Sequence, residues 1–306
     1  MKKSLIALAV MAASGAAFAA TSNVDVYGQV RMAYTDTNTA TGDVSSQASR
    51  IGLKGSEDLG GGMSAVWGLE YGIAPGQSAT VFTARNQFVG LKGAFGTALV
   101  GTHDTPYKLG GSADVFADTA ADSQAGTSGI IGRNTLDNRA DNAIAYISPD
   151  WNGFHFAAAG VTRDANTTGA SALAATSYVL VYANGPLKAT LGQETFKDAQ
   201  RGTKLNVSYK IGDIGLGYTH EDSKTLPGSA KDKADLMSVS YGMGPITLAA
   251  QYGKFNDDAT ADVKRTTVGV VYALSKRTNA ALAYTKDDNQ TAADTNATTL
   301  QLNHSF

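Results

Sequence analysis

The chain has 306 residues, a formal net charge of −2, 34 glycines, six prolines and no cysteine. The lack of cysteine excludes disulfide bonds and thiolate chemistry. A slightly acidic chain also lacks the concentrated basic surface that nucleic-acid binding needs, so we expect no nucleic-acid partner.

The first element in chain order is an export signal. The segment MKKSLIALAVMAASGAAFAA combines a basic start, an apolar middle and the small-residue ending Ala17-Phe18-Ala19. This pattern predicts a secretory signal peptide over residues 1–19 rather than a buried helix, because its apolar run is too short to span a membrane. Its removal takes away Lys2 and Lys3, which changes the net charge from −2 to about −4.

Residues 20–306 show a two-residue alternation of apolar and polar side chains. In KLNVSYKI, Leu205, Val207, Tyr209 and Ile211 fall on one face, and polar residues fall on the other. This is the period of a β-strand with one apolar face. We count about sixteen such segments: 24–36, 48–56, 63–73, 81–93, 97–102, 139–148, 153–163, 174–185, 186–197, 201–212, 213–222, 233–243, 244–256, 263–274, 277–287 and 296–306.

The connections between these segments differ in length. Tight turns such as Asn184-Gly185 and Gly244-Pro245 contrast with longer polar connections at 37–47, 164–173, 223–232 and 288–295. Short turns on one side and long loops on the other are typical of an up-and-down antiparallel β-barrel in the outer membrane of a Gram-negative bacterium. We therefore predict an all-β, multi-pass membrane barrel.

The last segment, TLQLNHSF, supports a closed barrel. Leu300, Leu302 and Phe306 share one face, so this strand can pair with the first strand and present apolar side chains to lipid. A β-sandwich would also alternate, and a solenoid would repeat, but we find no fixed short repeat. The polar face is rich in Lys, Arg, Asn, Gln and Ser along the chain, which favours a water-filled lumen.

Several stretches resemble the trimeric general porins of Gram-negative outer membranes, in their β-proteobacterial form. They are VDVYGQVR at 24–31, SRIGLKGSEDLGGGMSAVWGLE at 49–70, RNQFVGLKGAFGTALVG at 85–101, YISPDWNGFHFAAAG at 146–160, and the terminal HSF. The resemblance implies a sixteen-stranded homotrimer surrounded by outer-membrane lipid and lipopolysaccharide. It also implies passive, cofactor-free diffusion of ions and small hydrophilic solutes, with Phe306 as part of the assembly signal.

The longest connection, about 103–138, breaks the alternation, and so long a segment tends to be functional or disordered. In the resembled family the third loop folds into the barrel and narrows it. The acidic residues in this segment are Asp104, Asp114, Asp118, Asp122 and Asp137. By that resemblance Asp114 and Asp118 are the candidates for pore-facing carboxylates, and capping of local turns is the alternative.

The resemblance also places a ladder of arginines opposite this loop. Arg31, Arg50 and Arg139 lie on the polar face by alternation alone. Arg85 matches a ladder position, but by alternation it shares its face with the apolar Val89 and Leu91. Two alternatives are open: a β-bulge near 86–88 turns Arg85 inward, or Arg85 sits at the membrane rim. A structural ion pair is the alternative role for a single arginine in the lumen.

Other functions have weaker support in the sequence. The four histidines show no metal-ligand spacing, and no G-x-S-x-G motif is present, so we expect no metal, no cofactor and no enzyme. Three alternatives remain open: a substrate-specific porin, a plugged structural or adhesive barrel, and an outer-membrane hydrolase.

Overall fold

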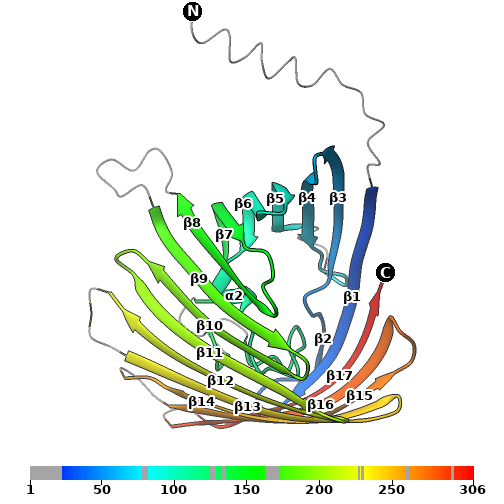
Figure 1. Ribbon diagram of the computed structural model, residues 1–306. Helices are drawn as coiled ribbons and strands as arrows, with labels where there is room; N and C mark the ends of the chain where they lie inside the picture. The colour runs from blue at the N-terminus through cyan, green and yellow to red at the C-terminus, as the bar shows by residue number, and fades with distance from the viewer. Residues whose placement is uncertain are drawn as a thin grey trace, which may run out of the picture.

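The computed structural model describes residues 23–77, 82–124, 129–132, 136–162, 173–226, 228, 231–258, 262–290 and 293–306. The predicted signal peptide, residues 1–19, lies outside this part of the chain. Figure 1 looks obliquely into a ring of strands, with the segment that carries α2 inside it. No helix within the described ranges is long and apolar enough to cross a membrane.

Seventeen strands and one short helix make up the described chain. They are β1 (Asn23–Thr37), β2 (Asp43–Ser46), β3 (Arg50–Gly60), β4 (Met63–Gly72), β5 (Thr83–Gly93), β6 (Gly96–Asp104), α2 (Pro106–Leu109), β7 (Arg139–Ile147), β8 (Phe154–Thr162), β9 (Leu173–Asn184), β10 (Leu187–Phe196), β11 (Gln200–Ile211), β12 (Ile214–Thr225), β13 (Lys231–Met243), β14 (Ile246–Asn256), β15 (Val263–Ala273), β16 (Thr278–Asn289) and β17 (Thr295–Ser305).

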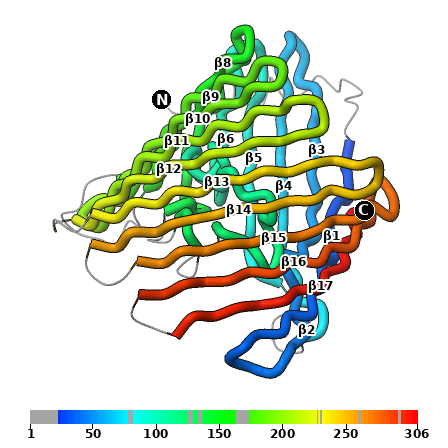
Figure 2. Tube along the Cα trace, turned by 90° about the horizontal axis from the view of Figure 1, so that it is seen from below, coloured from blue at the N-terminus to red at the C-terminus, as the bar shows by residue number. Residues whose placement is uncertain are grey.

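The strands form one closed antiparallel barrel. From β3 to β17 each strand pairs with the next, and β17 returns to β1 with the register Gln29↔Ser305. Figure 2 shows the red β17 beside the blue β1. Both β2 and β3 pair with β1, at Met32↔Ser46 and Gln29↔Arg50, so together they occupy one interrupted position. The barrel therefore has sixteen strand positions around its circumference, and the predicted fold is confirmed.

The alternation predicted from the sequence separates the two faces of the wall. On β11, Leu205 is 40% exposed and points outward, whereas its neighbour Lys204 is 1% exposed. Leu300 and Leu302 on β17 likewise lie on the outside. Because the outer face meets lipid tails, exposure of these side chains carries no hydrophobic penalty in the membrane.

Some predicted boundaries differ from those in the structure. The predicted loop 223–232 is largely strand, since β12 continues to Thr225 and β13 begins at Lys231. Residues 43–46 of the predicted loop 37–47 form β2. Both differences have one cause: the strands continue above the membrane, where polar residues replace the apolar side chains that mark a strand in the sequence.

The seam between β1 and β17 is packed closely at one glycine. Gly28 exchanges two backbone hydrogen bonds with Phe306, each 3.1 Å long. A Cβ atom at Gly28 would lie 2.6 Å from Cζ of the Phe306 ring. The ring therefore occupies the space that any larger residue at this position would need.

We predict that Gly28→Val weakens the closed barrel, because overpacking costs about 1–3 kcal/mol. Gly242→Val is the matched control, since the nearest atom to a new Cβ there is the Asp213 carbonyl oxygen at 3.8 Å. The measurement is the temperature at which the purified barrel loses its β circular-dichroism signal. Equal melting temperatures for the two variants would contradict the packing argument.

Candidate functional site

The described parts of the long loop, residues 105–124, 129–132 and 136–138, lie against the inner wall and pack there through buried side chains. The loop residues Ile130 and Ile131 are fully buried against Leu236 and Phe255 of the barrel. Phe116 forms a second buried cluster with wall alanines. The hydrophobic contacts that a soluble protein would place in a central core thus hold this loop to one side of the lumen.

Glycines on the wall make room for the loop's largest side chains. A Cβ atom at Gly253 would lie 2.8 Å from Cγ1 of Ile130, and one at Gly269 would lie 2.7 Å from Cε1 of Phe116. A glycine within a strand often marks such a close approach. The wall positions and the loop side chains therefore match each other in size.

Polar contacts also fix the loop along its length. The Tyr107 hydroxyl donates to Glu221 Oε2 at 2.9 Å, and the Gly132 amide donates to Glu221 Oε1 at 3.0 Å. Buried Lys204 pairs with Asp137. Since a buried charge is costly unless it is paired, these contacts strongly favour the loop's position inside the barrel.

Three of the predicted arginines lie near the middle of this loop. Arg50 Nη1 lies 3.2 Å from Asp118 Oδ2, and Arg31 Nη1 donates to the Asp118 backbone carbonyl. Arg50 Nε is also 4.0 Å from Glu70, whose other oxygen accepts from Arg85 Nε at 2.5 Å. Arg31, Asp118, Arg50, Glu70 and Arg85 thus form one continuous chain of contacts.

A register shift in β5 brings Arg85 into this cluster. Leu69 pairs with Gln87, but Tyr71 pairs with Ala84, so three steps on β5 match two steps on β4. The extra residue reverses the face on which Arg85 would lie by alternation. The bulge lies between Ala84 and Gln87, close to the predicted range 86–88.

Arg139 has its own acidic partner. Its Nη2 lies 3.0 Å from Asp104 Oδ1, and its Nε donates to Asn86 Oδ1 at 2.8 Å. Lys108 Nζ lies 3.8 Å from the same Asp104 oxygen. The charges of Arg85 and Glu70 act on Arg139 as well, so this group borders the first cluster. We call the two groups together the arginine cluster.

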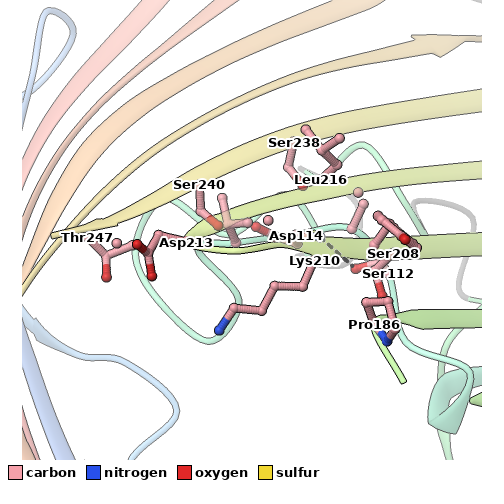
Figure 3. A pocket seen from close by; sticks show the side chains of 16 residues that line it. Ser112, Asp114, Pro186, Ser208, Lys210, Asp213, Leu216, Ser238, Ser240 and Thr247 are labelled. Atoms are coloured by element: carbon pink, nitrogen blue, oxygen red, sulfur yellow. Dashed lines mark hydrogen bonds between the residues drawn. The ribbon is translucent and has the colours of Figure 1, made fainter. Parts of the chain in front are cut away.

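Asp114 lies elsewhere. Its two carboxylate oxygens accept the backbone amides of Phe116 at 2.8 Å and Ser123 at 2.6 Å. This is the turn-capping arrangement that the sequence left open as the alternative. Asp114 also borders a hollow between the loop and the inner wall, beside Lys210 and Ser240 (Figure 3). The structure thus places Asp118, not Asp114, beside the arginines.

Sequence reasoning missed three members of the arginine cluster: Glu70, Asp104 and Lys108. Glu70 was detectable from the sequence, because it alternates with Leu69, which faces outward. The structure agrees, since Glu70 is only 8% exposed. Asp104 and Lys108 flank the start of the loop, and only the loop's path shows that they meet Arg139. Elsewhere on the wall, Arg265 of β15 pairs with Asp287 of β16 at 2.7 Å and donates to the Asp122 backbone carbonyl at 2.9 Å.

Charge is unequal within the arginine cluster. Its basic members are Arg31, Arg50, Arg85, Arg139 and Lys108, and its acidic members are Glu70, Asp104 and Asp118. A fourth carboxylate, Asp122, borders the cluster, because its Oδ2 accepts the Asp118 amide at 2.6 Å and its charge acts on Arg31. The side chains of Arg50 and Arg85 keep 24% and 22% of their surface exposed, so they face open space in the lumen. Across the described ranges no group of three or more His, Asp or Glu is placed to hold a metal ion.

Comparisons with known proteins identify the class of this barrel. The sequence model of the Gram-negative porin family matches residues 5–292. Outer membrane porin protein 32 of Delftia acidovorans is 34% identical over 91% of this chain and 87% of its own length. Major outer membrane protein P.IB of Neisseria meningitidis is 28% identical over 92% of this chain and 91% of its own length.

The solved structures agree with this assignment. An anion-selective porin from Comamonas acidovorans superposes with a TM-score of 0.79 at 25% identity, over 93% of this chain and 100% of that chain. The chain belongs to the Gram-negative porin family. It is a multi-pass porin of the Gram-negative outer membrane, as the sequence predicted.

The glycine that faces Ile130 offers a test of how the loop is held. We predict that Gly253→Val pushes the loop off the wall toward the open lumen and lowers single-channel conductance. Gly215→Val is the control, because a Cβ there would meet only the mobile Ser240 hydroxyl at 2.6 Å and the more distant Ser240 Cβ at 4.0 Å. Unchanged conductance of Gly253→Val in planar bilayers, with the folded barrel intact, would contradict this role.

Proposed function

We propose that this porin favours anions, and that the arginine cluster at the loop is its selective constriction. Arg31, Arg50, Arg85 and Arg139 supply the basic wall, and Asp118 supplies the facing carboxylate of the loop. The excess of basic groups over acids in the cluster carries this proposal. The similarity to an anion-selective porin from Comamonas acidovorans supports it.

Simple electrostatics gives the expected size of the preference. Five bases and four acids, with the bordering Asp122 counted, leave one uncompensated positive charge, and guanidinium groups stay charged at any relevant pH. In water, an anion about 7 Å from one such charge gains about 0.6 kcal/mol and a cation loses the same amount, so the two differ by about 1.2 kcal/mol. This corresponds to a roughly five- to tenfold preference for a monovalent anion over a cation. Low-dielectric walls on either side of a narrow pore strengthen that field.

Asp118 has a different effect from the arginines. Its Oδ2 lies 3.2 Å from Arg50 Nη1, so this ion pair partly neutralises the positive charge of Arg50. A carboxylate facing guanidinium groups sets up a transverse field, which orients dipolar solutes as they pass. Asp114 instead stabilises the fold of the loop, because its carboxylate oxygens accept two backbone amides of the loop.

We also infer how the chain is exported and assembled. Residues 1–19 act as a cleaved signal peptide, Phe306 contributes to the assembly signal, and the protein performs no catalysis. The functional assembly is a homotrimer.

The second loop, at 74–80, is short and uncharged, so it offers little for holding a neighbouring copy. An apolar hollow on the outer face of β4–β6, lined by Trp67, Leu69 and Val89, suits a neighbouring copy better.

The test is single-channel recording in a planar bilayer under a KCl gradient. Stepwise conductance is expected, with a zero-current potential of the sign that chloride sets. A zero-current potential with the sign set by potassium would overturn anion preference, and the absence of any steps from folded protein would overturn the open pore.

We predict that Arg50→Ala together with Arg139→Ala shifts the zero-current potential toward the potassium value, because the cluster loses two positive charges. Lys254→Ala with Lys264→Ala is the matched control. It removes the same charge from β14 and β15, where the two lysines lie on the outward face and alternate with the lumen-facing side chains. An equal shift in both variants would show that overall charge, rather than the cluster, sets the preference.

We also predict that light scattering in mild detergent gives a protein mass of three chains. Leu69→Lys in the outer hollow should convert the trimer to monomers, because it places a charge in an apolar contact. Leu216→Lys is the control on the far side of the barrel, where the outward side chain is 44% exposed. A monomer mass for the unaltered, folded protein would contradict the trimer.

A further inference from the structure

A hollow of about 400 Å³ lies in the lumen between the long loop and the inner wall (Figure 3), and a volume of this size is typical of small-molecule sites. Most of its wall residues belong to β11–β14 and lie close to the tight turns that join those strands. Short turns mark the periplasmic end of such barrels. The hollow therefore opens to the periplasmic half of the pore, on a different part of the wall from the arginine cluster of β1 and β3–β7.

Polar side chains face this hollow from the wall. Ser208 and Lys210 fall on the same face of β11 as buried Lys204, and Ser240 shares its face of β13 with buried Leu236. Because these buried side chains point inward, Ser208, Lys210 and Ser240 point inward as well. The polar residues that line the hollow from the wall are Ser208, Lys210, Asp213, Ser238, Ser240 and Thr247.

These six side chains have no hydrogen-bond or ion-pair partner within the described part of the chain. Deeper under the loop, by contrast, the hydroxyl groups of the wall are paired. Thr219 accepts the Ala113 amide at 2.7 Å, and Thr190 donates to the Gly110 carbonyl at 3.0 Å. The hollow thus keeps donors and acceptors that the fold does not use, and they are open to a solute.

The hollow contains opposite charges that do not pair with each other. Lys210 and Asp213 flank the tight turn between β11 and β12, and the Lys210 side chain extends toward the side where Asp213 and Thr247 lie (Figure 3). Asp114 adds a second carboxylate, but its oxygens already accept two backbone amides of the loop. One base and two acids do not favour an anion. A solute with one positive and one negative group satisfies both Lys210 and Asp213.

We propose that this hollow binds a small zwitterion, namely an α-amino acid with a polar side chain. The Lys210 ammonium donates to the carboxylate of the amino acid, and the Asp213 carboxylate accepts from its ammonium. The serine and threonine hydroxyls can donate and accept, so they suit a polar side chain. An amino acid has no net charge, so the arginine cluster does not exclude it. The site itself does not depend on the ion preference of the pore.

The test is a saturation-transfer NMR titration of L-serine against the purified full-length protein in detergent. Serinamide lacks the carboxylate, 3-hydroxypropionate lacks the ammonium, and glycerol lacks both. An exposed ion pair contributes about a factor of two to five. We therefore expect serine to bind at least about twofold more tightly than either singly charged analogue, and at least about fourfold more tightly than glycerol. This comparison uses the unaltered protein, so it does not depend on the folding of a variant.

Lys210→Gln with Asp213→Asn should weaken serine binding by about 4- to 25-fold, because both ion pairs are lost. The matched control is Lys54→Gln with Asp25→Asn, which removes one base and one acid from directly opposite positions on β3 and β1. It should leave serine binding unchanged, because these strands lie across the barrel from the hollow.

Equal losses in the two variants, or no loss in the first, would overturn the site. Glycerol that binds as tightly as serine would show a polyol site, and 3-hydroxypropionate that does so would show an anion site; either result overturns the zwitterion. Both variants keep the net charge of the protein, so the zero-current potential under a KCl gradient should stay at its unaltered value. That measurement shows that the variants form pores and separates this site from the proposed anion preference.

Discussion

Every backbone amide and carbonyl within the membrane must find its partner inside the protein, since lipid tails offer none. A sheet meets this demand only when its two edges join, as β1 and β17 do through nine residue pairs from Gln29↔Ser305 to Thr37↔Ala297. In a closed barrel every strand therefore has one face toward lipid and the other toward the water-filled lumen. The position of each remaining feature depends on that division.

The barrel also reverses the usual place of a core. Its exposed leucines and valines face the membrane, so the buried side chains gather inside, where the described parts of the long loop pack on the wall. Wall glycines such as Gly253 and Gly269 admit Ile130 and Phe116. The loop therefore covers one side of the lumen and leaves the other side, with its arginines, open to water.

The net charge that an ion meets in the lumen depends on which basic and acidic side chains lie together there, and not only on the composition of the chain. The whole chain is slightly acidic, yet the arginine cluster has five bases for four acids, the bordering Asp122 included. Glu70 lies between Arg50 and Arg85, and it holds both without cancelling them. An ion that crosses the barrel meets this local balance, because water and salt screen the more distant charges within about a nanometre.

The sequence by itself determined the sixteen strands, the two faces of the wall and the inward position of Arg31 and Arg50, because alternation is a local property of the chain. It also offered a bulge near Arg85 as one of two alternatives for that residue. Only the tertiary structure decided that the bulge is present, that Asp118 rather than Asp114 meets the arginines, and that Asp104 meets Arg139. Those contacts depend on strand register and on the loop's path, which are set by packing between residues far apart in the chain.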